Sequence, residues 1–293
     1  MAQWNSGIGS YLKDNKTLFE VIGVASSDGY FISTENRFPV DATFADNAVI
    51  GISSGSVADS SDIVSKINIA RGATTGYNYI NKFGYRENVG GTDAYHTVTS
   101  QGAYTFPTSA STAAVSSSNT GEDNGGTVLV TGLDADYNEV EETITIGQTG
   151  VTTFFRVNRA RMVEAGSGND VNEGNISITV GGETAGYIPA EFGQTNQAVY
   201  TVPAGHNGYV FQIDGGVDEK EKPQHLRLMA IDNTVTNPSR RSIMYFVFET
   251  SYAQHNQTVP IEVTEKTDLI LEMSSPDGSV EMSGGFDLVI RDN

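Results

Sequence analysis

The clearest candidate for hydrolytic chemistry is a serine between two glycines. Gly51-Ile-Ser-Ser-Gly55 matches the G-x-S-x-G pattern, in which a serine nucleophile sits on a strained turn between a strand and a helix. The residues that follow, Ser56-Val-Ala-Asp-Ser-Ser-Asp62, make a poor helix start, so we interpret the segment as a loop. The 36 acidic residues could supply a glycosidase pair, but their spacing singles out no two of them. We therefore predict no catalytic residues and a protein that is not an enzyme.

Metal-binding patterns are equally weak. Asp134-Ala-Asp-Tyr-Asn138 places oxygen ligands at alternate positions, as at the start of a calcium loop, but the twelfth position of that loop is Thr145 instead of Glu. The alternatives are a calcium site outside this motif and a plain hairpin turn, in which Asp and Asn supply the turn chemistry. The four histidines lack ligand spacing and the chain has no Cys, so we expect no metal site and no cofactor.

Three arginines lie close together in an otherwise acidic chain. Arg156, Arg159 and Arg161 belong to one alternating stretch, residues 152–164. On strand spacing, Arg159 and Arg161 share one face and Arg156 lies on the other. One interpretation is a contact between subunits, made to an acidic surface. The alternative is ion pairing within the domain. The glutamates available on the neighbouring predicted strand are Glu139, Glu141 and Glu142.

Tyrosines are dense in one part of the chain. Glycan sites need clustered aromatic and polar side chains in a concave surface, which makes these tyrosines candidates for glycan contact. The alternative is ordinary strand packing. The five candidates are Tyr77, Tyr79, Tyr85, Tyr95 and Tyr104.

The elements that must position these residues are short strands. Apolar residues alternate with polar ones in runs closed by Gly, Asn, Asp or Pro, which is typical of half-buried strands. The small-residue run 109–126 between two such stretches is predicted to be a loop. Many short strands with turn signals between them predict an all-β protein of tandem β-sandwich or jelly-roll-like domains. The predicted strands comprise residues 127–132, 139–147, 152–164, 175–181, 197–203, 208–214, 224–231, 242–250, 258–264, 268–273 and 279–291.

One predicted strand is apolar on both faces. Met244, Phe246 and Phe248 share one face, and Tyr245 and Val247 share the other. Because strands covered on both sides read as continuous apolar runs, we predict a central strand here.

Three parts of the chain differ in their patterning. Residues 1–90 are mixed, with strand-like runs at 18–24 and 63–70, and we interpret them as an extended N-terminal arm that pairs with a neighbour's sheet edge. The alternative is an outer strand layer of the same domain. Residues 91–190 are predicted to form a β domain, and residues 191–293 a C-terminal jelly-roll or immunoglobulin-like β-sandwich.

The net charge of −19 limits the partners. Nucleic-acid binding needs clustered Lys and Arg, and anionic membrane surfaces attract basic segments, so we expect neither partner. The first residues lack the basic and apolar regions of an export signal, and the longest apolar run, 244–248, is far shorter than the roughly 20 residues that span a bilayer. We expect a soluble protein made without a cleaved export signal.

Distinctive blocks run through roughly residues 67–293. They are Ile69-Ala-Arg-Gly72, Tyr79-Ile-Asn-Lys-Phe-Gly84, Val130-Thr-Gly-Leu-Asp-Ala-Asp-Tyr-Asn-Glu-Val-Glu-Glu142, Phe155-Arg-Val-Asn-Arg-Ala160, Ala165-Gly-Ser-Gly168, Asn172-Glu-Gly-Asn-Ile176, Gly193-Gln-Thr-Asn-Gln-Ala-Val-Tyr-Thr-Val-Pro-Ala-Gly205 and Gly285-Phe-Asp-Leu-Val-Ile-Arg-Asp-Asn293. Together they resemble a family of virion structural proteins of tailed bacteriophages, especially marine ones such as cyanophages. That family has no catalytic motif, so no functional residues carry over.

The resemblance implies a component of a virus particle. We expect a non-enzymatic structural protein, an external head decoration or collar component that assembles through its sandwich surfaces and its N-terminal arm. The expected partners are other virion proteins (capsid, collar or tail) and further copies of the chain, with a trimer as one candidate. The alternative is a tail fibre or spike protein that contacts host surface glycans. In both cases the protein would be located in the virion.

Overall fold

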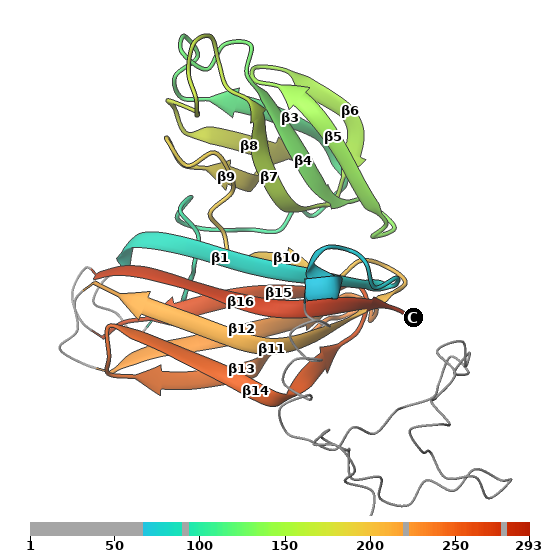
Figure 1. Ribbon diagram of the computed structural model, residues 1–293, viewed down its shortest axis with the longest axis vertical. Helices are drawn as coiled ribbons and strands as arrows, with labels where there is room; N and C mark the ends of the chain where they lie inside the picture. Colours follow the sequence, from blue (N-terminus) through green and yellow to red (C-terminus); the bar gives the residue numbers. More distant parts are fainter. Residues whose placement is uncertain (1–66, 90–93, 219–222, 277–279) are drawn as a thin grey trace, which may run out of the picture. The chain divides into compact units, whose positions relative to one another are not determined.

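The computed structural model describes residues 67–89, 94–218, 223–276 and 280–293, which belong to one compact unit. These residues form four antiparallel sheets, which make two sandwiches (Figure 1). The predicted strand at 18–24, the glycine-serine motif at 51–55 and the arm lie mainly or wholly outside the described residues. Among the residues described, no helix is long and apolar enough to cross a membrane.

Eight strands form a jelly roll by nested pairing. The first strand pairs with the last, β1 with β16, and the nesting continues inward as β10 with β15, β11 with β14, and β12 with β13. The four strand pairs fold over so that β16 also pairs with β11, and β15 with β12. The resulting sheet orders are β1-β16-β11-β14 and β10-β15-β12-β13. This topology confirms the predicted all-β, jelly-roll-like fold. The bounds are β1 (Tyr77–Val89), β10 (Val199–Thr201), β11 (His206–Val217), β12 (Gln224–Asp232), β13 (Arg240–Phe248), β14 (Tyr252–Val263), β15 (Thr267–Ser274) and β16 (Val280–Asp292).

A second sandwich is inserted between the first two strands of the jelly roll. Its sheets have the orders β6-β3-β8-β9 and β5-β4-β7. The chain leaves and re-enters the jelly roll side by side, because Ala198 N donates to Val98 O at 2.9 Å and Thr99 bridges Gln197. The bounds are β2 (His96–Thr97), which pairs with β15, and then β3 (Ser111–Ser117), β4 (Thr127–Leu133), β5 (Glu139–Thr145), β6 (Thr149–Phe154), β7 (Arg156–Glu164), β8 (Ile176–Val180) and β9 (Glu183–Ile188).

β1 comes from the predicted N-terminal segment, residues 1–90, but it pairs with the last strand of the chain, β16. The last part of the predicted segment 1–90, Tyr77–Val89, lies in a sheet of the jelly roll. The residues just before it, 67–70, form a helical turn closed by a hydrogen bond from Arg71 N to Ile67 O, so the predicted strand 63–70 is wrong over its described part.

Each sandwich has its own core. In the jelly roll, side chains such as Leu226, Leu271 and Phe286 are fully buried between the two sheets. In the inserted sandwich, Phe154 and Ile178 belong to a separate buried cluster. Alternating burial along the strands, as in β8, follows from the two-residue period of a strand that has one face on the core.

The strand at 240–248 differs from its prediction. Met244 and Phe248 are buried, as their shared face predicts, and Phe246 packs against the same core. However, β13 is the last strand of its sheet, and Tyr245 and Val247 are 51% and 44% exposed. The predicted central strand is therefore wrong, because β13 lies at the edge of its sheet and its outer face is only partly covered at these two side chains.

Two further strand predictions also need correction. The predicted loop 109–126 contains β3, an inner strand of its sheet, whose Ala113 and Val115 are buried. Because small side chains differ little in polarity, this strand shows no clear alternation of apolar and polar residues in the sequence. The predicted strand 152–164 is divided between β6 and β7 at Phe155, whose backbone N–H donates to Leu133 O at 2.6 Å.

The loop between β4 and β5 is a hairpin turn, one of the two predicted alternatives. Asp134 Oδ1 accepts hydrogen bonds from the backbone N–H groups of Asp136 and Asn138, both at 2.9 Å. Tyr137 adopts a left-handed conformation with φ of 68°. The Asp134 carboxylate thus orders its own turn.

The jelly roll closes tightly at one glycine of β1. A Cβ atom at Gly84 would lie 2.0 Å from the backbone O of Val98 and 2.8 Å from the backbone N of Ala198. Only glycine allows β1 to approach the crossing point where the inserted sandwich begins and ends.

We predict that Gly84→Ala lowers the free energy of unfolding by about 1–3 kcal/mol, because the methyl group has to displace backbone atoms. Chemical denaturation measures this loss. Gly121→Ala is the control, since its nearest contact is 3.8 Å from the new Cβ atom. Equal stability of the two variants would contradict the close approach at Gly84.

Candidate functional site

The inserted sandwich reaches the jelly roll through a bulge in β7. The register between β4 and β7 shifts at Asn158, which is the extra residue of the bulge. Val157 and Ala160 therefore both face the inserted core, although they are three residues apart. Arg156 and Arg159 both contact the jelly roll. The prediction that these two arginines lie on opposite faces is wrong, because the bulge resets the alternation.

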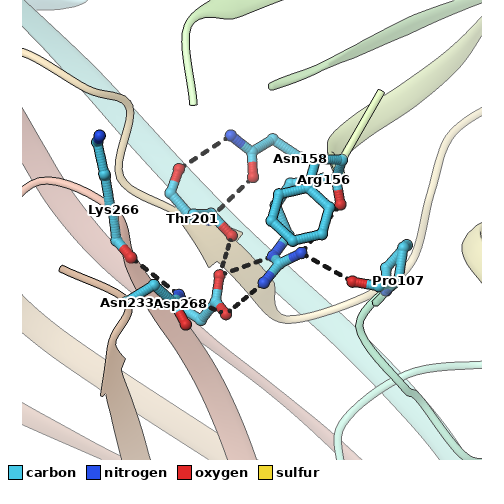
Figure 2. Close-up of polar contacts among 8 residues, drawn as sticks. Pro107, Arg156, Asn158, Thr201, Asn233, Lys266 and Asp268 are labelled. Atoms are coloured by element: carbon cyan, nitrogen blue, oxygen red, sulfur yellow. Dashed lines mark hydrogen bonds and ion pairs between the residues drawn. The ribbon is translucent and has the colours of Figure 1, made fainter. Parts of the chain in front are cut away.

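Arg156 forms a buried ion pair with the jelly roll. Its Nε donates to Asp268 Oδ1 and its Nη2 to Asp268 Oδ2, both at 3.0 Å, in a two-pronged contact with β15 (Figure 2). The two residues are only 5% and 2% exposed. The planar guanidinium matches the carboxylate in both geometry and charge. The predicted pairing with Glu139, Glu141 or Glu142 is not the contact made by Arg156.

The remaining donors and faces of Arg156 are also used. Its Nη1 donates to the backbone O of Pro107 and of Phe155, each at 3.0 Å. The guanidinium lies 4.1 Å from the ring centre of Phe155 and 4.7 Å from that of Phe106. Stacking on aromatic faces stabilises a cation that has lost its water.

Asp268 is held equally firmly on the jelly-roll side. Thr201 Oγ1 donates to Asp268 Oδ1 at 2.6 Å, and Asn233 Nδ2 donates to Asp268 Oδ2 at 2.9 Å (Figure 2). Next to it, the Asn158 side chain makes a two-way contact with the Thr201 backbone, at 3.0 and 2.9 Å. The bulge residue and the ion pair therefore fix the same stretch of β10.

The other two arginines have different surroundings. Arg159 Nη2 donates to the backbone O of Asn81 in β1 at 2.7 Å, which is a second contact across the junction. Arg161 is exposed. Of the three predicted contact residues, two join parts of one chain, and a contact between subunits stays a prediction for Arg161.

Lys82 is a buried amine beside this junction. It is 3% exposed, and its Nζ donates to the backbone O of Asn158. Burial and the nearby charge of Arg159 lower the pKa of Lys82 to about 7. This buried lysine was not predicted, because its neighbours Asn158 and Arg159 come from a distant part of the sequence.

Clefts lie on both sides of the contact between β1 and the inserted sandwich. One, of about 700 Å³, is lined by Tyr79, Lys82, Glu139 and Arg159 among others. The second, of about 900 Å³, is lined by aromatic residues of both sandwiches. Both volumes are in the range of small-molecule sites, about 300–1,000 Å³.

The five predicted glycan tyrosines do not form one cluster. Tyr79 lines the smaller cleft and Tyr85 the larger one. Tyr77 stacks with Arg291, and the ring of Tyr95 lies 3.5 Å from the guanidinium carbon of Arg227. Tyr104 packs edge-on against Phe106 over the outer face of β15, so it serves strand packing.

The Arg156–Asp268 pair is a structural contact between the two sandwiches. The charged groups of Arg156 and Asp268 are saturated with partners, as described above. In the part of the chain that the structure describes, no three His, Asp or Glu side chains are grouped so that they could hold a metal ion. What the arrangement does is join two sandwiches.

The comparisons with known proteins add little to this geometry. No protein-family model and no curated protein matches the chain. Among solved structures, that of infectious bursal disease virus Gt strain has 11% identity and a TM-score of 0.23, covering 73% of this chain and 72% of that one. The Gx strain of the same virus has 11% identity and a TM-score of 0.12, with 78% and 87% covered. TM-scores this low define neither the fold nor the function of this chain.

We predict that Arg156→Met lowers the free energy of unfolding by about 3–5 kcal/mol, because it leaves the Asp268 carboxylate buried without its cation. The double variant Arg156→Met/Asp268→Asn should recover at least half of that loss, since no buried charge remains. Urea denaturation of both variants measures the difference. Arg161→Met on the same strand is the exposed control, with a change within about 0.5 kcal/mol. A double variant less stable than the single one would contradict the pairing.

We predict that Lys82 makes stability depend on alkaline pH. The unfolded chain keeps this proton up to about pH 10.5, whereas the folded protein loses it near pH 7. The unfolded state therefore binds more protons between these values, and stability rises with pH by up to about 1.4 kcal/mol per unit. Unfolding free energies at pH 7.5 and 9.5, measured for the natural protein and for Lys82→Met, give the difference. Parallel profiles would show that Lys82 keeps its ordinary pKa.

Proposed function

We propose that this chain is a non-enzymatic structural protein of a virus particle. More specifically, we propose an external head decoration or collar component of a tailed phage. The observation that carries the proposal is a jelly roll with a second sandwich inserted after its first strand and joined to it by the buried Arg156–Asp268 pair. Such a chain presents two protein surfaces in a fixed geometry, which is what repeated assembly requires.

The fold alone does not decide between functions. Jelly rolls occur in viral shells, lectins and cupins, so the argument must come from the particular surfaces. Cupin chemistry is not favoured, because the interior of this jelly roll is filled by apolar side chains such as Leu226, Leu271 and Phe286. A packed interior favours a scaffold that works through its exterior.

The exterior supports assembly through repeated contacts. With a net charge of −19, identical copies repel each other unless they meet at a complementary surface, which limits unspecific association. Symmetric homo-oligomers are the common outcome when such a surface exists. β14 is an edge strand with a mostly exposed face, which offers a backbone edge to another copy or to a segment such as residues 1–66.

The partners in this proposal are other virion proteins (capsid, collar or tail) and further copies of the chain. Residues 1–66 of the predicted N-terminal arm are proposed to bind a neighbouring subunit, by adding a strand to a sheet edge. The protein would be assembled in the bacterial cytoplasm and retained in the mature virion, without a nucleic-acid or membrane partner.

We predict that the purified protein binds in many copies to empty heads of the phage that carries its gene. Light scattering and co-sedimentation, with and without heads, measure the copy number. Deletion of residues 1–66 should abolish or sharply reduce binding, while the circular dichroism of the remaining strands stays unchanged. A stable trimer that does not bind heads would contradict the decoration role and favour a tail fibre.

The tail-fibre alternative, a receptor-binding protein that contacts host glycans, has one specific observation in its favour. The larger cleft at the junction brings aromatic rings from both sandwiches next to polar side chains. A head decoration protein could use this cleft equally well, so the cleft does not decide where on the particle the chain is located.

A further inference from the structure

The larger cleft continues onto the outer face of the sheet β1-β16-β11-β14. Residues that alternate with the buried ones share this face, and the register sets Phe83 beside Gly285 and Gly285 beside Asp214. In the next row, Tyr85 lies opposite Ser283. Aromatic side chains of the edge strand β1 therefore stand next to small residues of β16.

Small residues line the cleft on the β16 side. Ser283 and Gly284 belong to its lining, together with Phe83 and Tyr85 of β1. Short side chains of β16 therefore lie beside aromatic side chains of β1 at this cleft.

The second wall comes from the inserted sandwich. Phe192 is 46% exposed, and its ring contacts that of Phe83, with ring centres 6.4 Å apart and the planes tilted by 53°. Tyr187 lines the same wall. Rings from two sandwiches thus meet at one site, which exists only because the junction holds them together.

Polar groups lie between these rings. Asp214 lines the cleft, and burial together with the charge of Asp287 raises its pKa. Asn175 of the inserted sandwich and Gln101 of the connecting segment also line it. Carboxylate and amide groups beside aromatic faces are suited to sugars, which present hydroxyl groups at the rim and apolar C–H groups on the faces of the ring.

The charges in the cleft favour an uncharged ligand. Asp214 and Glu87 are its acidic residues, and its cation, Arg86, donates to the backbone O of Thr97 and of Gly102. The guanidinium is thus used to hold the connecting segment. An acidic polysaccharide would meet carboxylates with no cation directed toward it.

We propose that this cleft is a binding site for an uncharged oligosaccharide, with Phe192 and Phe83 as stacking residues and Asp214 as a hydrogen-bonding residue. The site goes beyond the structural role proposed above and does not depend on it. A head decoration that holds a surface glycan and one that does not would bind heads equally well, so the two proposals can fail separately.

The test uses the full chain and defined sugars. Isothermal titration and saturation-transfer NMR are carried out with cellohexaose, maltohexaose, xylohexaose and mannohexaose as neutral probes, and with hexagalacturonate as the acidic probe. Phe192→Ala removes an exposed ring without opening a core. Tyr245→Ala is the matched control, because Tyr245 is 51% exposed and lies on β13 of the other jelly-roll sheet.

The expected result is millimolar or tighter binding of at least one neutral hexamer and no binding of hexagalacturonate. Phe192→Ala should weaken this binding by at least about tenfold, which corresponds to about 1.4 kcal/mol, and Tyr245→Ala should leave it unchanged. The proposal is overturned if no neutral hexamer binds, if the acidic hexamer binds as well as the neutral ones, or if both variants lose binding equally.

Discussion

The buried carboxylate of Asp268 is the constraint on which the arrangement of this chain depends. A carboxylate that is 2% exposed is costly unless a cation and hydrogen-bond donors surround it. The cation comes from the inserted sandwich as Arg156, and the donors come from the jelly roll as Thr201 and Asn233. Separating the two sandwiches would leave this charge without its partner, so the ion pair holds the two sandwiches together.

This ion pair matters because the inserted sandwich has only two chain connections to the jelly roll. These run side by side near Val98 and Ala198, where a connection alone would act as a hinge. The contacts of Arg156, Asn158 and Arg159 lie away from that point along β10, β15 and β1, and they oppose rotation about it. Both junction clefts take their shape from these contacts. The proposed assembly and the proposed ligand binding would therefore depend on the same physical feature.

The sequence predicted most of the fold and little of the site. Alternation located β4, β8 and β12 well, because each has one face on a core, and β15 was located although both of its faces are buried. It missed β3, because the small residues of this strand show little difference in polarity between its two faces. It also wrongly predicted β13 as a central strand, because the outer face of β13 is apolar although it is exposed at a sheet edge. The role of Arg156 was not predictable, because its partner is 112 residues away and the bulge at Asn158 decides where it points. Phe192 gave no local signal either, since its setting depends on the junction.

The central claim is that the two sandwiches behave as one rigid body. Residual dipolar couplings of backbone amides, measured on the deuterated protein in a weakly aligning medium, test it most directly. If the junction is rigid, couplings from the jelly roll and from the inserted sandwich fit a single alignment tensor. Two tensors of different magnitude or orientation in the natural protein would contradict the account, because the sandwiches would then move independently despite the Arg156–Asp268 pair.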